Sequence, residues 1–141
     1  MTMIQTGFWI GERDWWVMAT IDIRGERDLG EVFKALMSCG CPNDEAQKAC
    51  MVLSKRNSGY TFTDAEGRYT LMFVSEADSV DELFDTIIHE VRHATDHIGE
   101  YFGLKARGED SAYLQGEISK KLFPAVALAV CPKCHEEKEE G

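Results

Sequence analysis

The sequence has no excess of positive charge and no long hydrophobic run. Its 141 residues include 25 acidic and 15 basic side chains, which gives a formal net charge of -10. Phosphate backbones and anionic membrane surfaces repel a chain this acidic. A transmembrane helix needs about 20 consecutive apolar residues, whereas the longest run here, Leu122 to Val130, is shorter and contains Pro124. We therefore expect neither a nucleic acid nor a membrane as a partner.

Signals for export and disulfide formation are also missing. The first ten residues contain no basic cluster followed by an apolar segment, so they do not resemble a secretory signal peptide, and we expect a cytoplasmic protein. The five cysteines are then expected to be thiols or metal ligands. Cys131 and Cys134 form a C-x-x-C string, half of a four-thiolate zinc site. Cys39 and Cys41 could supply the other half, and free thiols are the alternative.

The chain contains only three prolines and no repeat or linker-like segment. Its hydrophobic share of 44% and charged share of 28% are typical of a globular protein. We therefore predict a single domain over residues 1–135. The acidic residues 136–141 are expected to form a disordered tail.

Hydrophobic periodicity predicts two β-hairpins and four helices. The expected strand pairs are Ile4–Ile10 with Trp15–Ile23, and Tyr60–Thr63 with Arg68–Val74. The expected helices cover about residues 29–38, 43–55, 79–98 and 109–130. Hairpins and helices are segregated along the chain without β-α-β alternation. The pattern predicts an α+β fold in which the hairpins pack against the helices.

The third expected helix contains an H-E-x-x-H motif, formed by His89, Glu90 and His93. Residues four apart lie on one helical face, about 6 Å apart along the axis, so both imidazoles can bind one Zn²⁺. Glu90 would lie beside the metal and could act as a general base towards a zinc-bound water. The alternative is an amphipathic helix that carries two exposed histidines and no metal.

The apolar residues of this helix are expected on the face opposite the histidines. They are Val80, Phe84, Ile87, Val91, Ala94 and Ile98. Because residues are spaced by about 100° around a helix, these side chains cluster roughly 180° from His89. One side of the helix can then pack against a sheet while the other faces a cleft.

A third zinc ligand must come from elsewhere in the chain, because His97 lies too far along the helix. His89 and His97 would be about 12 Å apart along a straight helix. Asp96, His97 and Glu100 are therefore expected in the cleft, where they could orient a ligand imidazole.

Glu109, the first residue of the last expected helix, is the predicted third ligand. Asp110, Glu117 and Glu100 are the alternatives, and an acidic residue favoured by the helix dipole is the purely structural interpretation of Glu109.

Tyr113 shares a helical face with Glu109 and is the predicted oxyanion donor. Ala112 and Gly116 lie on the same face, where their small side chains would allow close approach to the motif helix.

The motif His89–His93, followed by the string Glu109–Tyr113, resembles the zincin-like metallopeptidases whose third ligand is a glutamate on the next helix. Small zincin-like proteins of bacteria and phages are the most similar in pattern. The resemblance covers about residues 60–122 and implies a zincin-like fold. In that group a hairpin strand just before the zinc helix borders the cleft and pairs with an extended peptide. Here that strand would be Arg68–Val74.

The resemblance implies a zinc-dependent hydrolase that acts on a peptide or protein substrate, with Zn²⁺ as cofactor. One alternative is a catalytically silent zincin-like module that binds a protein partner, for which the unexplained N-terminal half is available. Another is a structural zinc ion that joins two helices. The structural alternative predicts a closed four-ligand site, for which His97 is a candidate ligand, and no exchangeable water, whereas the binding module predicts partner binding that survives Glu90→Gln.

Overall fold

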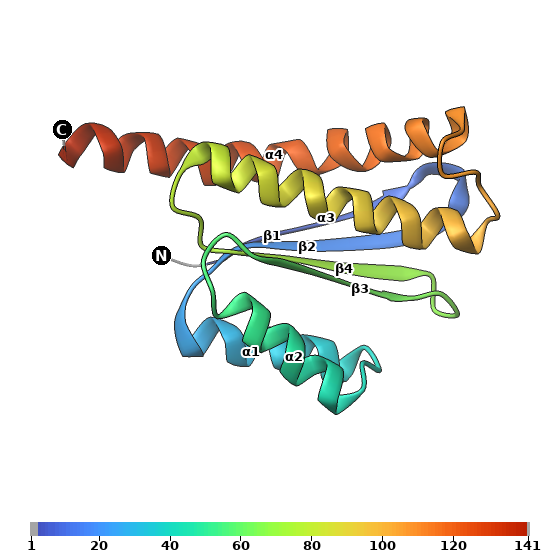
Figure 1. Cartoon of the computed structure of the whole chain (residues 1–141), viewed down its shortest axis with the longest axis horizontal. Coiled ribbons are helices and arrows are strands. Elements are labelled where there is room, and N and C mark those ends of the chain that lie inside the picture. The colour runs from blue at the N-terminus through green and yellow to red at the C-terminus, as the bar shows by residue number, and fades with distance from the viewer. Residues whose placement is uncertain (1–2, 141) are drawn as a thin grey trace.

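The computed structural model describes the backbone of residues 3–140 and the side chains of residues 3–131. One sheet lies between two layers of helices (Figure 1). The strands are β1 (Ile4–Ile10), β2 (Trp15–Ile23), β3 (Gly59–Asp64) and β4 (Tyr69–Ser75). The helices are α1 (Gly25–Ser38), α2 (Asn43–Leu53), α3 (Val80–Tyr101) and α4 (Glu109–Glu140), with a 3-10 turn at Gly11–Arg13. This arrangement confirms the α+β class.

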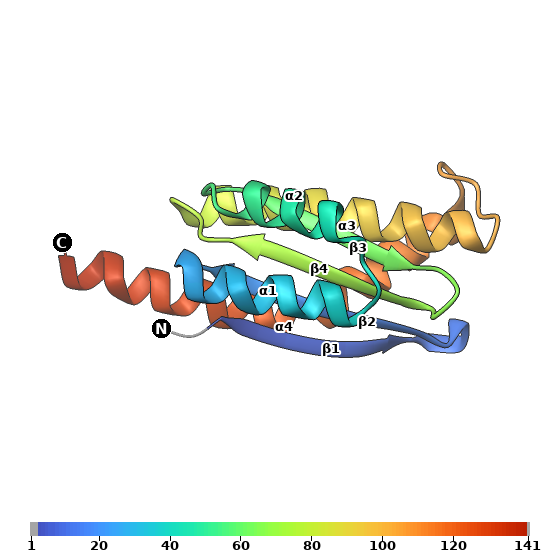
Figure 2. The ribbon, with the colours of Figure 1, turned by 90° about the horizontal axis from the view of Figure 1, so that it is seen from below.

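The sheet has the strand order β1-β2-β4-β3, so β1 and β3 are its outer strands (Figure 2). Both predicted hairpins are present as antiparallel pairs. The central strands β2 and β4 are parallel, and they join the two hairpins into one mixed sheet. A parallel pair needs a long crossover connection, which α1, α2 and β3 provide here. The order of hairpins and helices along the chain is as predicted, but the parallel pairing of the two hairpins was not part of that prediction.

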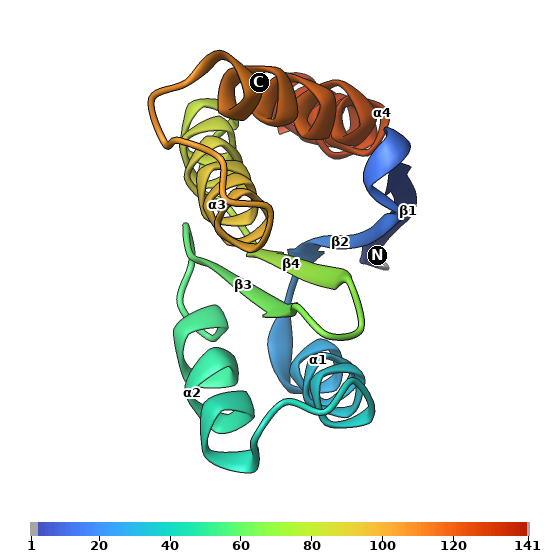
Figure 3. The same ribbon diagram turned by 90° about the vertical axis from the view of Figure 1, so that its right-hand side faces the viewer.

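Helices cover both faces of the sheet, α1 and α2 on one and α3 and α4 on the other (Figure 3). Strand β4 is consequently buried on both sides. Leu71 and Phe73 pack towards α1 and α2, whereas Met72 and Val74 pack towards α3 and α4. Burial on both faces explains why this strand is almost continuously apolar, because each successive side chain enters a core.

The helix α3 carries the H-E-x-x-H motif and begins where the sequence predicts. The side chain of Ser79 caps it by accepting a hydrogen bond from the backbone N–H of Glu82. Five of the six residues expected on the apolar face are buried or half-buried, and four of them, Ile87, Val91, Ala94 and Ile98, belong to the core on this side of the sheet. Phe84 is the exception, because it is 61% exposed.

The helix α4 packs beside α3 and continues to Glu140, past the predicted end near residue 130. Within residues 3–140, no helix combines the length and the apolar character that a membrane crossing requires. The predicted disordered tail, residues 136–141, lies outside the residues whose side chains are described. That tail and the domain boundary before it remain predictions.

Candidate metal centre

The helix α3 presents His89 and His93 together on its exposed face. Their Nε2 atoms lie 3.0 Å apart, and the ring centroids are separated by 4.6 Å. Two ligands of a tetrahedral zinc ion, each 2.0–2.1 Å from the metal, lie about 3.3 Å apart. The pair therefore has a spacing close to that needed to hold one ion between the rings.

Glu90 completes a group of three residues that could hold a metal. One ligand atom from each of His89, Glu90 and His93 lies within 4.8 Å of the others. Unlike the two exposed histidines, Glu90 is only 3% exposed. Its Oε1 atom accepts a hydrogen bond of 2.8 Å from the hydroxyl of Thr61 on β3. A buried carboxylate with one oxygen held and one remaining is suited to accepting a proton beside a metal.

The edge strand β3 makes room for this carboxylate through Gly59. A Cβ atom at position 59 would lie 2.5 Å from Cγ of Glu90 and 2.7 Å from its Oε2 atom. Any other residue here would displace the Glu90 side chain. Gly59, Thr61 and Thr63 are spaced by two, so they share the face of β3 that is turned towards α3. That alternation in the sequence is the signal by which Thr61 and Thr63 could have been found.

His97 lies one turn beyond the pair and is held by a hydrogen bond to the sheet. Its Nδ1 atom is 2.9 Å from Oγ1 of Thr63. Burial lowers the pKa of His97, and the nearby His93 lowers it further, while Asp96 and Glu100 oppose this shift. The ring is therefore favoured in its neutral form near pH 7. His97 lies outside the group of possible metal ligands.

A cleft of about 450 Å³ runs along the outer edge of β3. Its lining residues are Glu45, Thr61, Phe62, Thr63, Ala65, His97, Glu100 and Tyr101. The strand expected to border the cleft, Arg68–Val74, corresponds to β4, and this expectation is wrong. β4 lies between β2 and β3, so β3 is the strand with a free edge.

The predicted third ligand, Glu109, is not brought to the histidine pair. It is exposed at the first residue of α4, and no group of ligand atoms within the described residues includes it. On the side of α3 that faces α4, Arg92 pairs with Asp96 at 3.2 Å and contacts Gln115 at 3.4 Å. The assignment of Glu109 remains a prediction, and Glu117, one of its alternatives, is paired with Lys121.

Tyr113 is 73% exposed, and its role as an oxyanion donor remains a prediction. Ala112 and Gly116, expected to approach α3, are exposed as well. The face of α4 that enters the core carries Leu114 and Ile118 instead. Burying the larger apolar side chains removes more surface from water, so their positions set the rotation of α4.

The cysteines divide between the two faces of the sheet. Cys39 and Cys41 follow α1 on one face, and Cys131 is exposed on α4, which covers the other. These three thiols therefore do not share one zinc ion, and the side chain of Cys134 lies outside the described residues. Burial, assisted by Glu45 and Asp44, raises the pKa of the Cys41 thiol to about 11.

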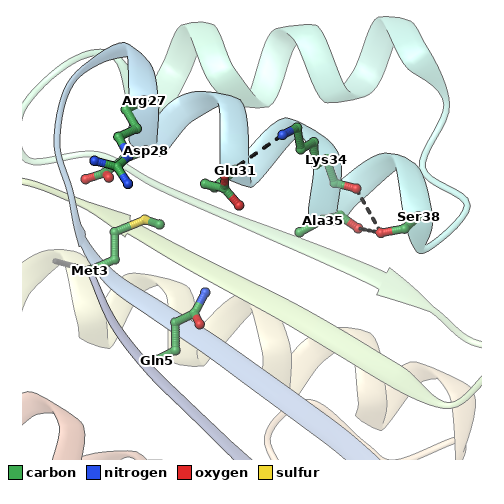
Figure 4. A pocket seen from close by; sticks show the side chains of 8 residues that line it. All are labelled: Met3, Gln5, Arg27, Asp28, Glu31, Lys34, Ala35 and Ser38. Carbon is green, nitrogen blue, oxygen red and sulfur yellow. Dashed lines mark hydrogen bonds and ion pairs between the residues drawn. The ribbon is translucent and has the colours of Figure 1, made fainter.

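A second hollow, of about 540 Å³, lies between α1 and the outer strand β1 (Figure 4). Its α1 side carries Arg27, Glu31 and Lys34, and its β1 side carries Met3 and Gln5. The hollow is on the face of the sheet opposite α3, so it is separate from the histidine pair.

Comparison of the chain with family models, with curated proteins and with solved structures finds no match. The similarity to zincin-like metallopeptidases thus depends on the H-E-x-x-H motif and the residues that follow it.

Proposed function

We propose that the protein is a zinc-dependent peptidase, or a close relative that hydrolyses another amide bond. The observation that supports this most is the pair of imidazole Nε2 atoms, 3.0 Å apart, with the buried Glu90 carboxylate beside them. The two imidazoles suit zinc as ligands, and the Glu90 carboxylate beside them is the proposed general base. Glu109 is the proposed third protein ligand, and Tyr113 the proposed oxyanion donor.

Zinc, when bound, supplies Lewis acidity and lowers the pKa of water. Glu90 is the proposed general base and acid, which accepts a proton and then donates it. Thr61 holds one oxygen of its carboxylate in place, and the other oxygen accepts the proton of the attacking water. In this mechanism the water oxygen would bond to the carbonyl carbon as Glu90 takes its proton, and Glu90 would then pass this proton to the leaving amine nitrogen as the C–N bond breaks.

An extended peptide is the substrate that the cleft fits best. The outer edge of β3 has no neighbouring strand among the described residues, so its outward N–H and C=O groups are free to pair with an added strand. The cleft of about 450 Å³ follows this edge, and α3 contributes His97, Glu100 and Tyr101 to it, beyond the motif residues along the helix. The resemblance to zincin-like peptidases implies the same mode of binding.

The test is cleavage of fluorescein-labelled casein by zinc-loaded protein, with Glu90→Gln compared against Glu82→Gln. Glu82 is an exposed residue in the first turn of the same helix, so it is a matched control. We expect Glu90→Gln to lose about 100-fold or more in rate, since general base catalysis contributes 10²–10⁴-fold, and to keep its zinc. Full activity in Glu90→Gln would contradict the mechanism, and cleavage that survives chelation would contradict the zinc dependence.

The second candidate function is a binding module that acts through a protein partner. Trp9 favours it, because this large aromatic side chain is 55% exposed on the outer strand β1. In that case partner binding would survive Glu90→Gln and would be lost in Trp9→Ala. Affinity purification with both variants separates the two functions.

A further inference from the structure

We propose that His97 is a substrate-binding residue, whose Nε2–H donates a hydrogen bond to a backbone carbonyl oxygen of the peptide in the β3 cleft. This inference rests on the proposed peptidase function. Its basis is a chain of hydrogen bonds that reaches His97 from the interior of the sheet and determines which ring nitrogen carries the proton.

The chain begins at the indole of Trp15 on β2. The Nε1–H group of Trp15 can only donate, and it does so to Oγ1 of Thr70 on β4, at 3.0 Å. Oγ1 of Thr70 lies 2.9 Å from Oγ1 of Thr63 on β3, which in turn lies 2.9 Å from Nδ1 of His97. Four side chains from three strands and α3 therefore form one continuous series of contacts.

One direction of donation satisfies every member of this series. Thr70 accepts from Trp15 and donates its single hydroxyl proton to Thr63, and Thr63 donates its own proton to Nδ1 of His97. The reverse direction would leave the hydroxyl proton of Thr70 with no acceptor in the series. Thr70 is 0% exposed, and a buried polar group without a partner is costly. With Thr70 donating to Thr63, an Nδ1–H group on His97 would leave the hydroxyl proton of Thr63 without an acceptor in the series. We therefore assign Nδ1 as the acceptor, which places the proton of the neutral ring on Nε2.

The ring is also held in place before any ligand binds. Trp15 and Thr70 are both fully buried, so the far end of the series is fixed in the core. His97 itself is half-buried and lines the cleft beside Thr63. Because Nδ1 contacts Thr63 on β3, Nε2 lies on the other side of the ring, away from that hydroxyl, and His97 is among the residues that line the cleft. A donor fixed in this way loses little rotational freedom on binding.

The position of His97 indicates which part of the peptide it contacts. Its ring centroid lies 6.3 Å from that of His93. An extended chain advances about 3.3 Å per residue, so His97 lies about two residues from the metal pair. The bond therefore contributes to peptide binding more than to the chemical step.

The first experiment measures the tautomer and does not depend on catalysis. ¹⁵N NMR of the imidazole nitrogens, at a pH where His97 is neutral, should show Nε2 protonated and Nδ1 unprotonated in the wild type. Thr63→Val should convert this to a mixture of tautomers, and Thr63→Ser should restore it, because serine keeps the hydroxyl. An Nδ1–H tautomer in the wild type, or no response to Thr63→Val, would overturn the inference.

The second experiment measures cleavage of fluorescein-labelled casein by the zinc-loaded protein. His97→Phe should lower kcat/KM by about 10-fold, the effect of one net hydrogen bond, mainly through a higher KM. His97→Gln, which places an N–H group near the position of Nε2, should recover most of this loss. An unchanged KM in His97→Phe, or an equal loss in both variants, would overturn the role of His97 alone. Absence of cleavage by the wild type would overturn the peptidase function and, with it, this substrate role.

Discussion

Replacing Gly59 with alanine should disable the proposed catalytic carboxylate while leaving the metal ligands in place. The added methyl carbon would lie 2.5 Å from Cγ of Glu90, whereas ordinary contacts begin at 3.4 Å. Glu90 must therefore move by about 1 Å, and a 1 Å misplacement of a catalytic group can cost about 100-fold in rate. We expect kcat/KM for labelled casein to fall by about that factor.

The same substitution should have a modest effect on stability. Movement of Glu90 breaks its hydrogen bond from Thr61, and hydrogen bonds to charged groups contribute about 1.5–3 kcal/mol. Alanine in place of glycine in a strand returns about 0.5–1 kcal/mol. The free energy of unfolding should therefore fall by about 1–2 kcal/mol, which leaves the protein folded in the assay.

Three measurements on Gly59→Ala test this reasoning: casein cleavage, zinc content by elemental analysis and urea unfolding. Gly30→Ala is the matched control, because a Cβ atom at position 30 meets nothing within 4 Å. A wild-type rate in Gly59→Ala would refute the proposed role of the Glu90 position. A loss of zinc together with activity would show that the substitution disturbs the histidine pair.

Other predictions concern stability and thiol reactivity. Gly30 is a solvent-exposed residue in the middle of α1. Gly30→Ala should raise the free energy of unfolding, measured in urea, by about 1 kcal/mol, because alanine has the higher helix propensity. A decrease would show that α1 is not helical at this position. Ser79→Ala removes the side-chain cap of α3 and should lower the free energy of unfolding by about 1 kcal/mol. Ser38→Ala is the control, because Ser38 is not an N-cap residue, and it should have a smaller effect. Iodoacetamide at pH 8 should modify the exposed Cys131 well before Cys41, whose pKa is raised to about 11. The thiolate is the reactive form of cysteine. The alkylation rate of Cys41 should therefore rise only as the pH approaches its pKa of about 11. Mass spectrometry of digested peptides measures both rates, and equal rates at pH 8 would contradict the burial of Cys41.

Local features of the fold could be predicted from the sequence because their signals are local. Stretches rich in aromatic, β-branched and apolar residues, separated by short polar turns, mark both hairpins, and the Ser79 cap marks the start of α3. The motif histidines lie on the exposed face of α3, as the helical period requires. Each of these features depends on residues within a few positions of one another.

Features that depend on distant pairing could not be predicted in the same way. A period of two shows that a segment is a strand, but it does not show which strand lies beside it. The parallel pairing of β2 with β4 places β4 in the interior and leaves β3 at the edge. For that reason the sequence predicts β4, and not β3, as the strand that borders the cleft. It also does not predict the contacts of Thr61 with Glu90 and of Thr63 with His97.

The rotation of α4 was the other unpredicted feature of the candidate site. The small residues Ala112 and Gly116 suggested the face that would approach α3, but Leu114 and Ile118 face the core. A helix with apolar residues on several sides has no single strongly apolar face, so its rotation is determined by the elements that it packs against.

The central claim, a zinc ion held by the α3 histidines, is tested most directly by metal content. Elemental analysis should be carried out on wild-type protein purified without chelator, on His93→Ala and on Cys131→Ser. The account predicts about one zinc per chain in the wild type and in Cys131→Ser, and none in His93→Ala. Absence of zinc from the wild type, even after titration with the metal, or retention of zinc by His93→Ala, would contradict it.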